Sequence, residues 1–258
     1  IVMLIEDRLR CILDVVEKQR SISVLELTEL FNASESTIRR DLTTLDNKGL
    51  LIKVHGGAIA IDNSYTIKDA DVNQRLSLNK DEKSYIAKYA ASLITSEDFV
   101  YIDAGTTTAL MLDYIAAKGA IFVTNAISHG KKLSALGFTV YMLGGELKSS
   151  TEAIVGYDAL LSLSKYNFTK GFFGSNGVSL EKGFTTPDIK EAMVKEQAIK
   201  RCREAFILCD QSKFNKVSPI TFCAFEDSTV ITTTLKDKAF SNYSNILEVP
   251  NNDIHHNL

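Results

Sequence analysis

The segment Asp103-Ala104-Gly105-Thr106-Thr107-Thr108 has the residue types best suited to bind a small anion. It follows the apolar residues 99–102, which are typical of a buried strand, and it precedes residues with a helical pattern. Free backbone N–H groups, three hydroxyls and the positive end of a helix would together favour a phosphate group. Turns of this kind also occur without a ligand, so the segment by itself is only a weak signal.

Three other turns have the same small and polar character, namely Thr124-Asn125, Leu143-Gly144-Gly145-Glu146 and Gly174-Ser175-Asn176-Gly177. Helical and strand-like segments alternate around them, which predicts an α/β domain with a mainly parallel sheet. Ligands of such sheets bind at the carboxyl ends of the strands, so we expect the turns to converge on one site. The predicted strands are 99–102, 120–123, 138–143, 171–174, 205–208, 229–232 and 246–249, and the predicted helices are 85–93, 109–116, 129–136 and 189–201.

Charged residues accompany two of these elements. Lys213 lies in a turn after the predicted strand 205–208, where it could pair with an anionic ligand. Glu191 and Lys195 are four residues apart on a predicted helix, and on spacing alone an exposed ion pair is the favoured interpretation. Alternatively, a carboxylate could be the base of a sugar-phosphate isomerase, although no spacing requires that arrangement. The candidates for such a base are Asp103, Glu146, Glu191 and Asp210.

A helix with a wholly polar outer face is predicted within the first 60 residues. It begins after the N-cap Ser34 and ends before Gly49, and Ile38, Leu42 and Leu45 face inward. Arginine can donate two hydrogen bonds to guanine, and serine and threonine can contact bases or phosphates, so the opposite face could read DNA. That face carries Ser36, Arg40, Thr43, Thr44 and Asn47, and Thr37 and Arg39 flank it.

Two preceding helices and a hairpin complete the pattern of a winged helix-turn-helix. The second helix follows a capping box formed by Ser23 and Glu26. Residues 50–58 carry β-forming residues into the pair Gly56-Gly57, which predicts a hairpin wing. On the wing, His55 could contact the DNA backbone or could equally cap the hairpin. The inward stripes of the first two helices are Ile5, Leu9, Ile12, Leu13 and Val16, and Val24, Leu27, Leu30 and Phe31.

The net charge of −3 provides no overall attraction to DNA. Residues 1–60 contain 8 Lys and Arg against 9 Asp and Glu, but residues 39–58 contain an excess of two positive charges. Each chain should therefore make few phosphate contacts, which favours binding as a dimer or larger homo-oligomer. A winged helix can also bind a protein instead of DNA, and this alternative stays open at the level of residue patterns.

The segment SVLELTELFNASESTIRRDLTTLDNKGLLIKVHGGA resembles the helix-turn-helix of the DeoR family, whose hallmark S-x-x-T-I-R-R-D-L here spans Ser34 to Leu42. The segments DAGTTT, VTNAI, LGGELK, GFTTPDIKEAMVKEQAI and DQSKF are similar to landmarks of the DeoR sensor domain. That domain is related in fold to sugar-phosphate isomerases such as ribose-5-phosphate isomerase. The expected fold is thus a winged helix-turn-helix followed by a larger α/β domain with a mainly parallel sheet.

The resemblance implies a repressor of a sugar-metabolism operon that is not an enzyme, needs no cofactor, and binds double-stranded operator DNA and a phosphorylated sugar as a dimer or tetramer. The expected organisation is a DNA-binding domain at 1–60, a linker at 61–78 and a sensor domain at 79–258. The candidate DNA-binding residues are Ser34, Ser36, Thr37, Arg39, Arg40, Thr43, Lys53, His55 and Gly56. The candidate effector-binding residues are Asp103, Gly105, Thr106, Thr107, Thr108, Asn125, Gly144, Gly145, Lys195 and Lys213.

Other classes of protein find little support in the sequence. No apolar run reaches the ~18 residues needed to span a bilayer, and the start IVMLIEDRLR does not resemble a signal peptide, so a cytoplasmic protein is expected. The four cysteines form no C-x-x-C pair, which favours buried free thiols over a metal site. His129 is expected on a helix surface, and His255-His256 in a frayed tail.

Overall fold

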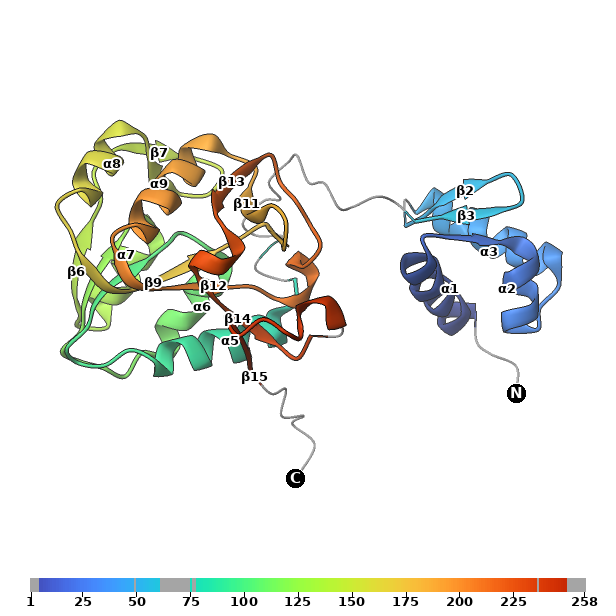
Figure 1. Cartoon of the computed structure of the whole chain (residues 1–258), viewed down its shortest axis with the longest axis horizontal. Helices are drawn as coiled ribbons and strands as arrows, with labels where there is room; N and C mark the ends of the chain where they lie inside the picture. Colours follow the sequence, from blue (N-terminus) through green and yellow to red (C-terminus); the bar gives the residue numbers. More distant parts are fainter. Residues whose placement is uncertain (1–4, 49, 61–74, 76–77, 236, 250–258) are drawn as a thin grey trace, which may run out of the picture. The chain divides into compact units, whose positions relative to one another are not determined.

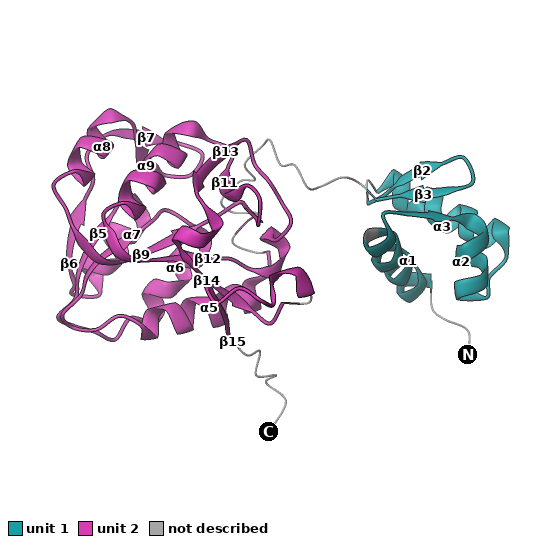
Figure 2. Cartoon of the chain, viewed as in Figure 1, with its two compact units in different colours: residues 1–63 teal, residues 64–258 magenta. Residues whose placement is uncertain are grey.

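The computed structural model describes residues 5–48, 50–60, 75, 78–235 and 237–249. The chain divides into two compact units, residues 1–63 and 64–258, which are described separately (Figure 2). The predicted helix stop at Gly49, the pair His255-His256 and the predicted linker apart from Arg75 and Leu78 lie outside the described residues.

Unit 1 has the three helices and the wing predicted for a winged helix-turn-helix, together with a third strand (Figure 1). The extra strand β1 precedes the second helix, and its sheet has the order β1-β3-β2, all antiparallel. At Gly57 a Cβ atom would collide with the Ile22 carbonyl of β1, so glycine permits the close pairing of the wing with this strand. The elements are α1 Ile5–Gln19, β1 Ser21–Ser23, α2 Val24–Phe31, α3 Glu35–Asn47, β2 Ile52–Val54 and β3 Gly57–Ile59.

The helix starts of unit 1 form as the sequence predicts. Ser23 and Glu26 make a complete capping box at α2, and the Ser34 side chain accepts from Thr37 N at α3. Two residues assigned to the inward stripes, Ile5 and Leu30, are exposed instead. The core that holds α3 in place includes Ile12, Val16, Leu27, Ile38, Leu42 and Leu45.

Unit 2 is built on a sheet of seven strands, all parallel, which confirms the predicted α/β class. The strand order is β15-β14-β12-β9-β4-β5-β6. The strands are β4 Phe99–Ile102, β5 Ile121–Thr124, β6 Thr139–Met142, β9 Phe168–Gly174, β12 Cys202–Leu208, β14 Thr229–Thr233 and β15 Ile246–Val249.

Helices cover both faces of this sheet, and each face has its own apolar core. Figure 1 shows α8 and α9 on one side of the sheet and α5 on the other. The predicted helix 109–116 begins earlier, at Thr106, and ends in a 3-10 turn at Leu112–Tyr114. The helices are α5 Lys80–Ser92, α6 Thr106–Met111, α7 Ile127–Ala135, α8 Tyr157–Leu163 and α9 Ile189–Ile199.

Several short elements were not predicted, because their periodic patterns span only a few residues. They are the hairpin β7 Glu146–Lys148 and β8 Ala153–Val155, the helix α8, and an antiparallel sheet of β10 Gly177–Ser179, β11 Gly183–Thr186 and β13 Ile220–Cys223. Short 3-10 turns follow at Gln211–Lys213, Phe225–Asp227 and Lys238–Phe240.

The strand order creates a switch point between β4 and β9. From β4 the chain continues through β5 and β6 to one edge of the sheet, and then returns to β9 on the other side of β4. From β9 it proceeds through β12, β14 and β15 to the opposite edge. Loops that leave neighbouring strands in opposite directions open a crevice at their carboxyl ends, which is where α/β sheets bind ligands.

Candidate functional site

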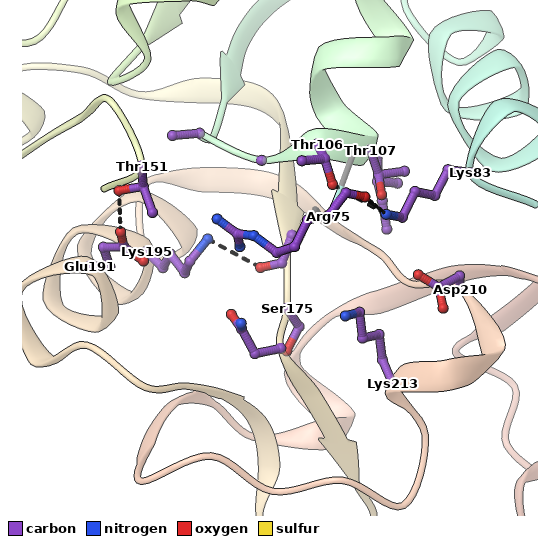
Figure 3. Close-up of a pocket in the computed structure, with 15 residues that line it drawn as sticks. Arg75, Lys83, Thr106, Thr107, Thr151, Ser175, Glu191, Lys195, Asp210 and Lys213 are labelled. Atoms are coloured by element: carbon purple, nitrogen blue, oxygen red, sulfur yellow. Dashed lines mark hydrogen bonds between the residues drawn. The ribbon is translucent and has the colours of Figure 1, made fainter. Parts of the chain in front are cut away.

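A pocket of about 550 Å³, including open solvent at its mouth, lies at this switch point. Its walls are the loops after β4, β9 and β12, together with side chains of α5 and α9 and the residue Arg75 (Figure 3). The residues that line it are Arg75, Lys83, Ala104, Gly105, Thr106, Thr107, Thr151, Gly174, Ser175, Asn176, Glu191, Lys195, Leu208, Asp210 and Lys213.

Two lysines at one end of the pocket have no carboxylate partner. Lys83 is only 3% exposed, and its ammonium donates to the Arg75 carbonyl and to Thr106 Oγ1 at 3.4 Å. Lys213 forms no hydrogen bond or ion pair through its side chain within the described part of the chain. Burial lowers the pKa of Lys83, and Lys213 and Arg75 lower it further, although Asp210 opposes them. Lys213 and Arg75 therefore disfavour the charged form of Lys83.

The Asp210 carboxylate beside these lysines is held through its Oδ1. It accepts from Asn79 Nδ2 at 2.9 Å, from Ser212 N at 3.0 Å and from the Ser212 hydroxyl. These bonds fix the turn after β12, which carries Lys213. Asp210 thus shapes this end of the pocket and offsets part of its positive charge.

At the other end, Lys195 forms a buried ion pair with Asp103 and also donates to the Gly174 carbonyl at 3.1 Å. Asp103 itself is 2% exposed and lies behind Lys195, outside the lining. Burial raises the pKa of Asp103, and the Lys195 ammonium opposes this rise. The pair holds α9 against the carboxyl end of β4.

Glu191 is one turn before Lys195 on α9 and faces the same pocket (Figure 3). Its Oε1 accepts from Lys148 Nζ at 3.0 Å and from Thr151 Oγ1 at 2.7 Å, both supplied by the β7–β8 hairpin. Lys148 also contacts Asp188 at 3.1 Å. Although burial lowers the pKa of Lys148, its bonds to Glu191 and Asp188 raise it overall, so Lys148 is charged at neutral pH. The exposed i,i+4 pair expected for Glu191 and Lys195 is therefore wrong.

The structure brings half of the ten candidate effector residues to the pocket wall, namely Gly105, Thr106, Thr107, Lys195 and Lys213. Asp103, Thr108 and Asn125 lie behind it and fix the loop after β4. Thr108 Oγ1 donates to the Asp103 carbonyl at 2.7 Å, and Asn125 Oδ1 accepts from Ala104 N at 2.9 Å. Gly144 and Gly145 are not among the lining residues, and a Cβ at Gly145 would meet the Val155 carbonyl at 2.6 Å.

Sequence patterns did not identify Arg75, Lys83, Thr151 or Glu191 as lining residues. Lys83 is on the first helix of unit 2, and its long side chain reaches the loop after β4, a contact that no local pattern reveals. Ser175 and Asn176 belong to a turn that the sequence singled out as a whole, while Asp210 and Glu191 were candidates only for the base of the isomerase alternative.

His129 on α7 is buried rather than at the helix surface, which corrects the prediction. Burial lowers its pKa to about 4, while the Gly105 carbonyl opposes the shift. Its Nδ1 has no hydrogen-bond partner within the described residues. His129 is buried because α7 packs here against β5 and β6. A single histidine on a helix gives no periodic pattern from which this burial could be predicted.

In unit 1, the candidate DNA-binding residues gather on the outer face of α3 and on the wing. Ser34, Ser36, Arg39 and Arg40 are exposed, while Thr37 and Thr43 are partly so. The Arg40 guanidinium has no hydrogen-bond or ion-pair partner in the described chain, whereas Arg39 pairs with Glu35 at 3.2 Å. On the wing, Lys53, His55 and Gly56 are exposed, and Gly56 has a positive φ of 86° that suits the turn.

Besides Glu35, two acidic residues near this face form contacts within unit 1. Asp41 accepts a hydrogen bond from Arg8 Nε at 2.6 Å, and Asp46 Oδ1 accepts from Lys53 N at 3.0 Å. The Lys53 ammonium also donates to Thr43 Oγ1 at 2.6 Å, which ties the wing to α3. Because Asp41 and Asp46 have other partners, the Arg40 guanidinium is available to bind an external acceptor.

The described residues hold neither a metal-binding cluster nor a membrane-spanning helix. They contain no cluster of three or more His, Cys, Asp or Glu that could hold a metal ion. All four cysteines are free, with Cys209 and Cys223 buried and Cys11 and Cys202 partly buried. No helix in the described ranges is long and apolar enough to cross a membrane.

Both units match known families. The sequence model of the DeoR-like helix-turn-helix domain matches residues 8–64, and that of the DeoR C terminal sensor domain matches residues 78–234. Among solved structures, ribose 5-phosphate isomerase A from Methanocaldococcus jannaschii is similar with a TM-score of 0.38 and 14% identity, covering 53% of this chain and 55% of that chain.

Full-length relatives are regulators rather than enzymes. The uncharacterized HTH-type transcriptional regulator FruR of Bacillus subtilis strain 168 is 43% identical over 93% of this chain and 96% of its own length. The lactose phosphotransferase system repressor of Staphylococcus aureus strain N315 is 34% identical over 90% of this chain and 93% of its own length. These relatives decide against the isomerase alternative. The chain therefore belongs to the DeoR family of transcriptional regulators.

Proposed function

We propose that the protein is a sequence-specific repressor of a sugar-metabolism operon, and that a phosphorylated sugar bound in the pocket controls its binding to operator DNA. One observation carries the sensor role: Lys83 and Lys213 both line the switch-point pocket, Lys213 lowers the pKa of Lys83, and neither forms an ion pair with a carboxylate in the described chain. A phosphate dianion would accept hydrogen bonds from both ammonium groups and relieve their repulsion. The lactose repressor among the relatives supports the repressor role.

The DNA-binding role is proposed for residues 1–60, and the sensor role for residues 79–258. Arg40 is the residue best placed to read a base, because its guanidinium is exposed and unpaired in the described chain. Ser34, Ser36, Thr37, Arg39, Thr43, Lys53, His55 and Gly56 would position α3 and the wing on the phosphate backbone. Since each chain offers few cations, we propose that a dimer or tetramer binds a repeated or palindromic operator.

The test begins with DNA sites that the full-length protein selects from a random double-stranded pool. Band-shift titrations then compare its affinity for the selected site with and without a panel of sugar phosphates. We expect at least one compound to change the affinity about tenfold or more, which is a coupling of about 1.4 kcal/mol. If no compound changes operator binding, the sensor role is wrong.

Two lysine variants make the test specific to the pocket. Lys213→Gln should remove the response to the active compound and leave DNA binding without ligand unchanged. Lys131→Gln removes an exposed lysine of α7 and should respond as the unaltered protein does. An equal loss of response in both variants would argue against a phosphate site at Lys213.

A further inference from the structure

The two ends of the pocket differ in charge. Lys83, Lys213 and Asp210 lie at one end, and Lys195, Glu191 and Thr151 lie at the other (Figure 3). At the first end, two lysines face a single carboxylate, Asp210, whose Oδ1 accepts three hydrogen bonds. This end therefore has a net positive charge and suits one phosphate group.

At the Glu191 end, each lysine is already paired with a carboxylate. Lys195 is paired with Asp103, and Lys148 behind the wall contacts both Glu191 and Asp188. Two cations thus face three carboxylates. In Figure 3 the Arg75 side chain extends from Lys83 toward Lys195, and with its charge counted here this end is neutral rather than positive. A second phosphate at this end would be placed beside Glu191 without a free counterion.

The groups at the Glu191 end suit neutral hydroxyls instead. Glu191 Oε1 is occupied, but Oε2 accepts no hydrogen bond from the described residues. The Lys195 ammonium has three protons and donates two of them, to Asp103 and to the Gly174 carbonyl, so one proton remains. A buried acceptor next to a donor matches a sugar hydroxyl, which both accepts and donates.

We propose that the effector is a sugar monophosphate. Glu191 would select it by accepting a hydrogen bond from a hydroxyl of the sugar and by repelling a second phosphate. The inference rests on the proposed function, because it assumes that the lysine end holds a phosphate. Glu191 would then be the residue that determines specificity. The β7–β8 hairpin would be its support, since Lys148 and Thr151 fix the carboxylate from that hairpin.

Calorimetric and thermal-shift titrations of the full chain would test this with matched compounds. The probes are inorganic phosphate and a panel of tetrose, pentose and hexose monophosphates, each hexose paired with its own bisphosphate, such as fructose 1-phosphate and fructose 6-phosphate with fructose 1,6-bisphosphate. We expect a monophosphate to bind more tightly than inorganic phosphate, and the bisphosphate of that sugar to bind at least about tenfold more weakly.

Glu191→Gln keeps the size of the side chain and an oxygen for Lys148 and Thr151, but it removes the charge. In this variant, the ratio of the affinity for the monophosphate to the affinity for the bisphosphate should fall about tenfold. Glu146→Gln is the matched control, because Glu146 is exposed, pairs with Lys190 at 2.6 Å and does not line the pocket. It should keep the discrimination of the unaltered protein.

The outcomes separate this inference from the proposed function. If a bisphosphate binds as tightly as the matching monophosphate, the selectivity proposal is wrong, while the phosphate site stands. If no monophosphate binds better than inorganic phosphate, the proposal that the Glu191 end binds sugar hydroxyls is wrong. If inorganic phosphate and all sugar phosphates fail to bind, the proposed sensor function fails as well. The comparison of ligands on the unaltered protein decides these cases even if Glu191→Gln does not fold.

Discussion

Lys195 of α9 is joined to Asp103 at the carboxyl end of β4 by a buried ion pair directly behind the pocket wall. Both side chains are almost wholly excluded from solvent, at 6% and 2% exposure. Asp103 therefore acts on the pocket through Lys195, although the sequence placed it among the ligand contacts. Its role is that of a positioning residue.

Removing one partner of this pair should be costly. We expect Asp103→Asn to destabilise unit 2 by about 3–5 kcal/mol, because it leaves the Lys195 ammonium buried without a countercharge. Denaturant unfolding of the full chain, followed by fluorescence of its tyrosines, measures the change. Glu146→Gln breaks the exposed pair with Lys190 and should cost less than about 1 kcal/mol. An equal decrease in the free energy of unfolding in the two variants would show that the buried pair stabilises the protein no more than the exposed pair does.

A second ion pair holds the proposed DNA-reading helix. Arg8 of α1 donates to Asp41 of α3 at 2.6 Å, with side-chain exposures of 14% and 7%. We expect Asp41→Asn to destabilise unit 1 by about 1–3 kcal/mol, since Arg8 loses its charged acceptor in a partly buried position. Glu35→Gln, which breaks the exposed pair with Arg39, should change stability by less than about 0.5 kcal/mol. Chemical denaturation of both variants tests the contrast.

Neighbouring arginines on α3 should differ in their effect on DNA binding. Arg40→Ala should abolish detectable operator binding or weaken it by about 1–3 kcal/mol, because its free guanidinium is proposed to read a base. Arg39→Ala should have a smaller effect, since Glu35 already holds Arg39. Band shifts on the selected site measure both. Effector-induced stabilisation should be intact in Arg40→Ala, and its loss would point to misfolding.

The buried imidazole of His129 should make the protein sensitive to acid. Burial lowers its pKa from 6.5 to about 4, so between these values the unfolded chain binds a proton that the folded chain excludes. Stability should consequently fall as pH falls from about 6.5 to 4, by up to about 3 kcal/mol. His129→Gln removes the titrating group and should flatten the profile over this range. Urea titrations at pH 7, 6 and 5 measure the free energy of unfolding of both proteins. If it falls with pH as steeply in His129→Gln as in the unaltered protein, His129 is not the group responsible.

Much of the fold follows from local sequence patterns. The stripe of Ile38, Leu42 and Leu45, the caps at Ser23 and Ser34, and the Gly56-Gly57 pair are short-range features, and the structure contains them as predicted. Alternating apolar and helical segments likewise predicted the parallel sheet. Such features depend on residues a few positions apart, so they can be inferred without knowledge of the tertiary structure.

Sequence patterns alone predict the winged helix, the α/β class and a set of polar turns at strand ends. Which of these turns meet depends on the three-dimensional fold, because the strand order β12-β9-β4-β5 places the ends of β4, β9 and β12 at one crevice and leaves Gly144 and Gly145 outside it. The fold also turned Glu191 and Lys195 from an expected surface pair into separate buried contacts with Lys148 and Asp103. Such partners lie 43 and 92 positions apart, and their encounter depends on the packing of whole helices and strands rather than on local spacing.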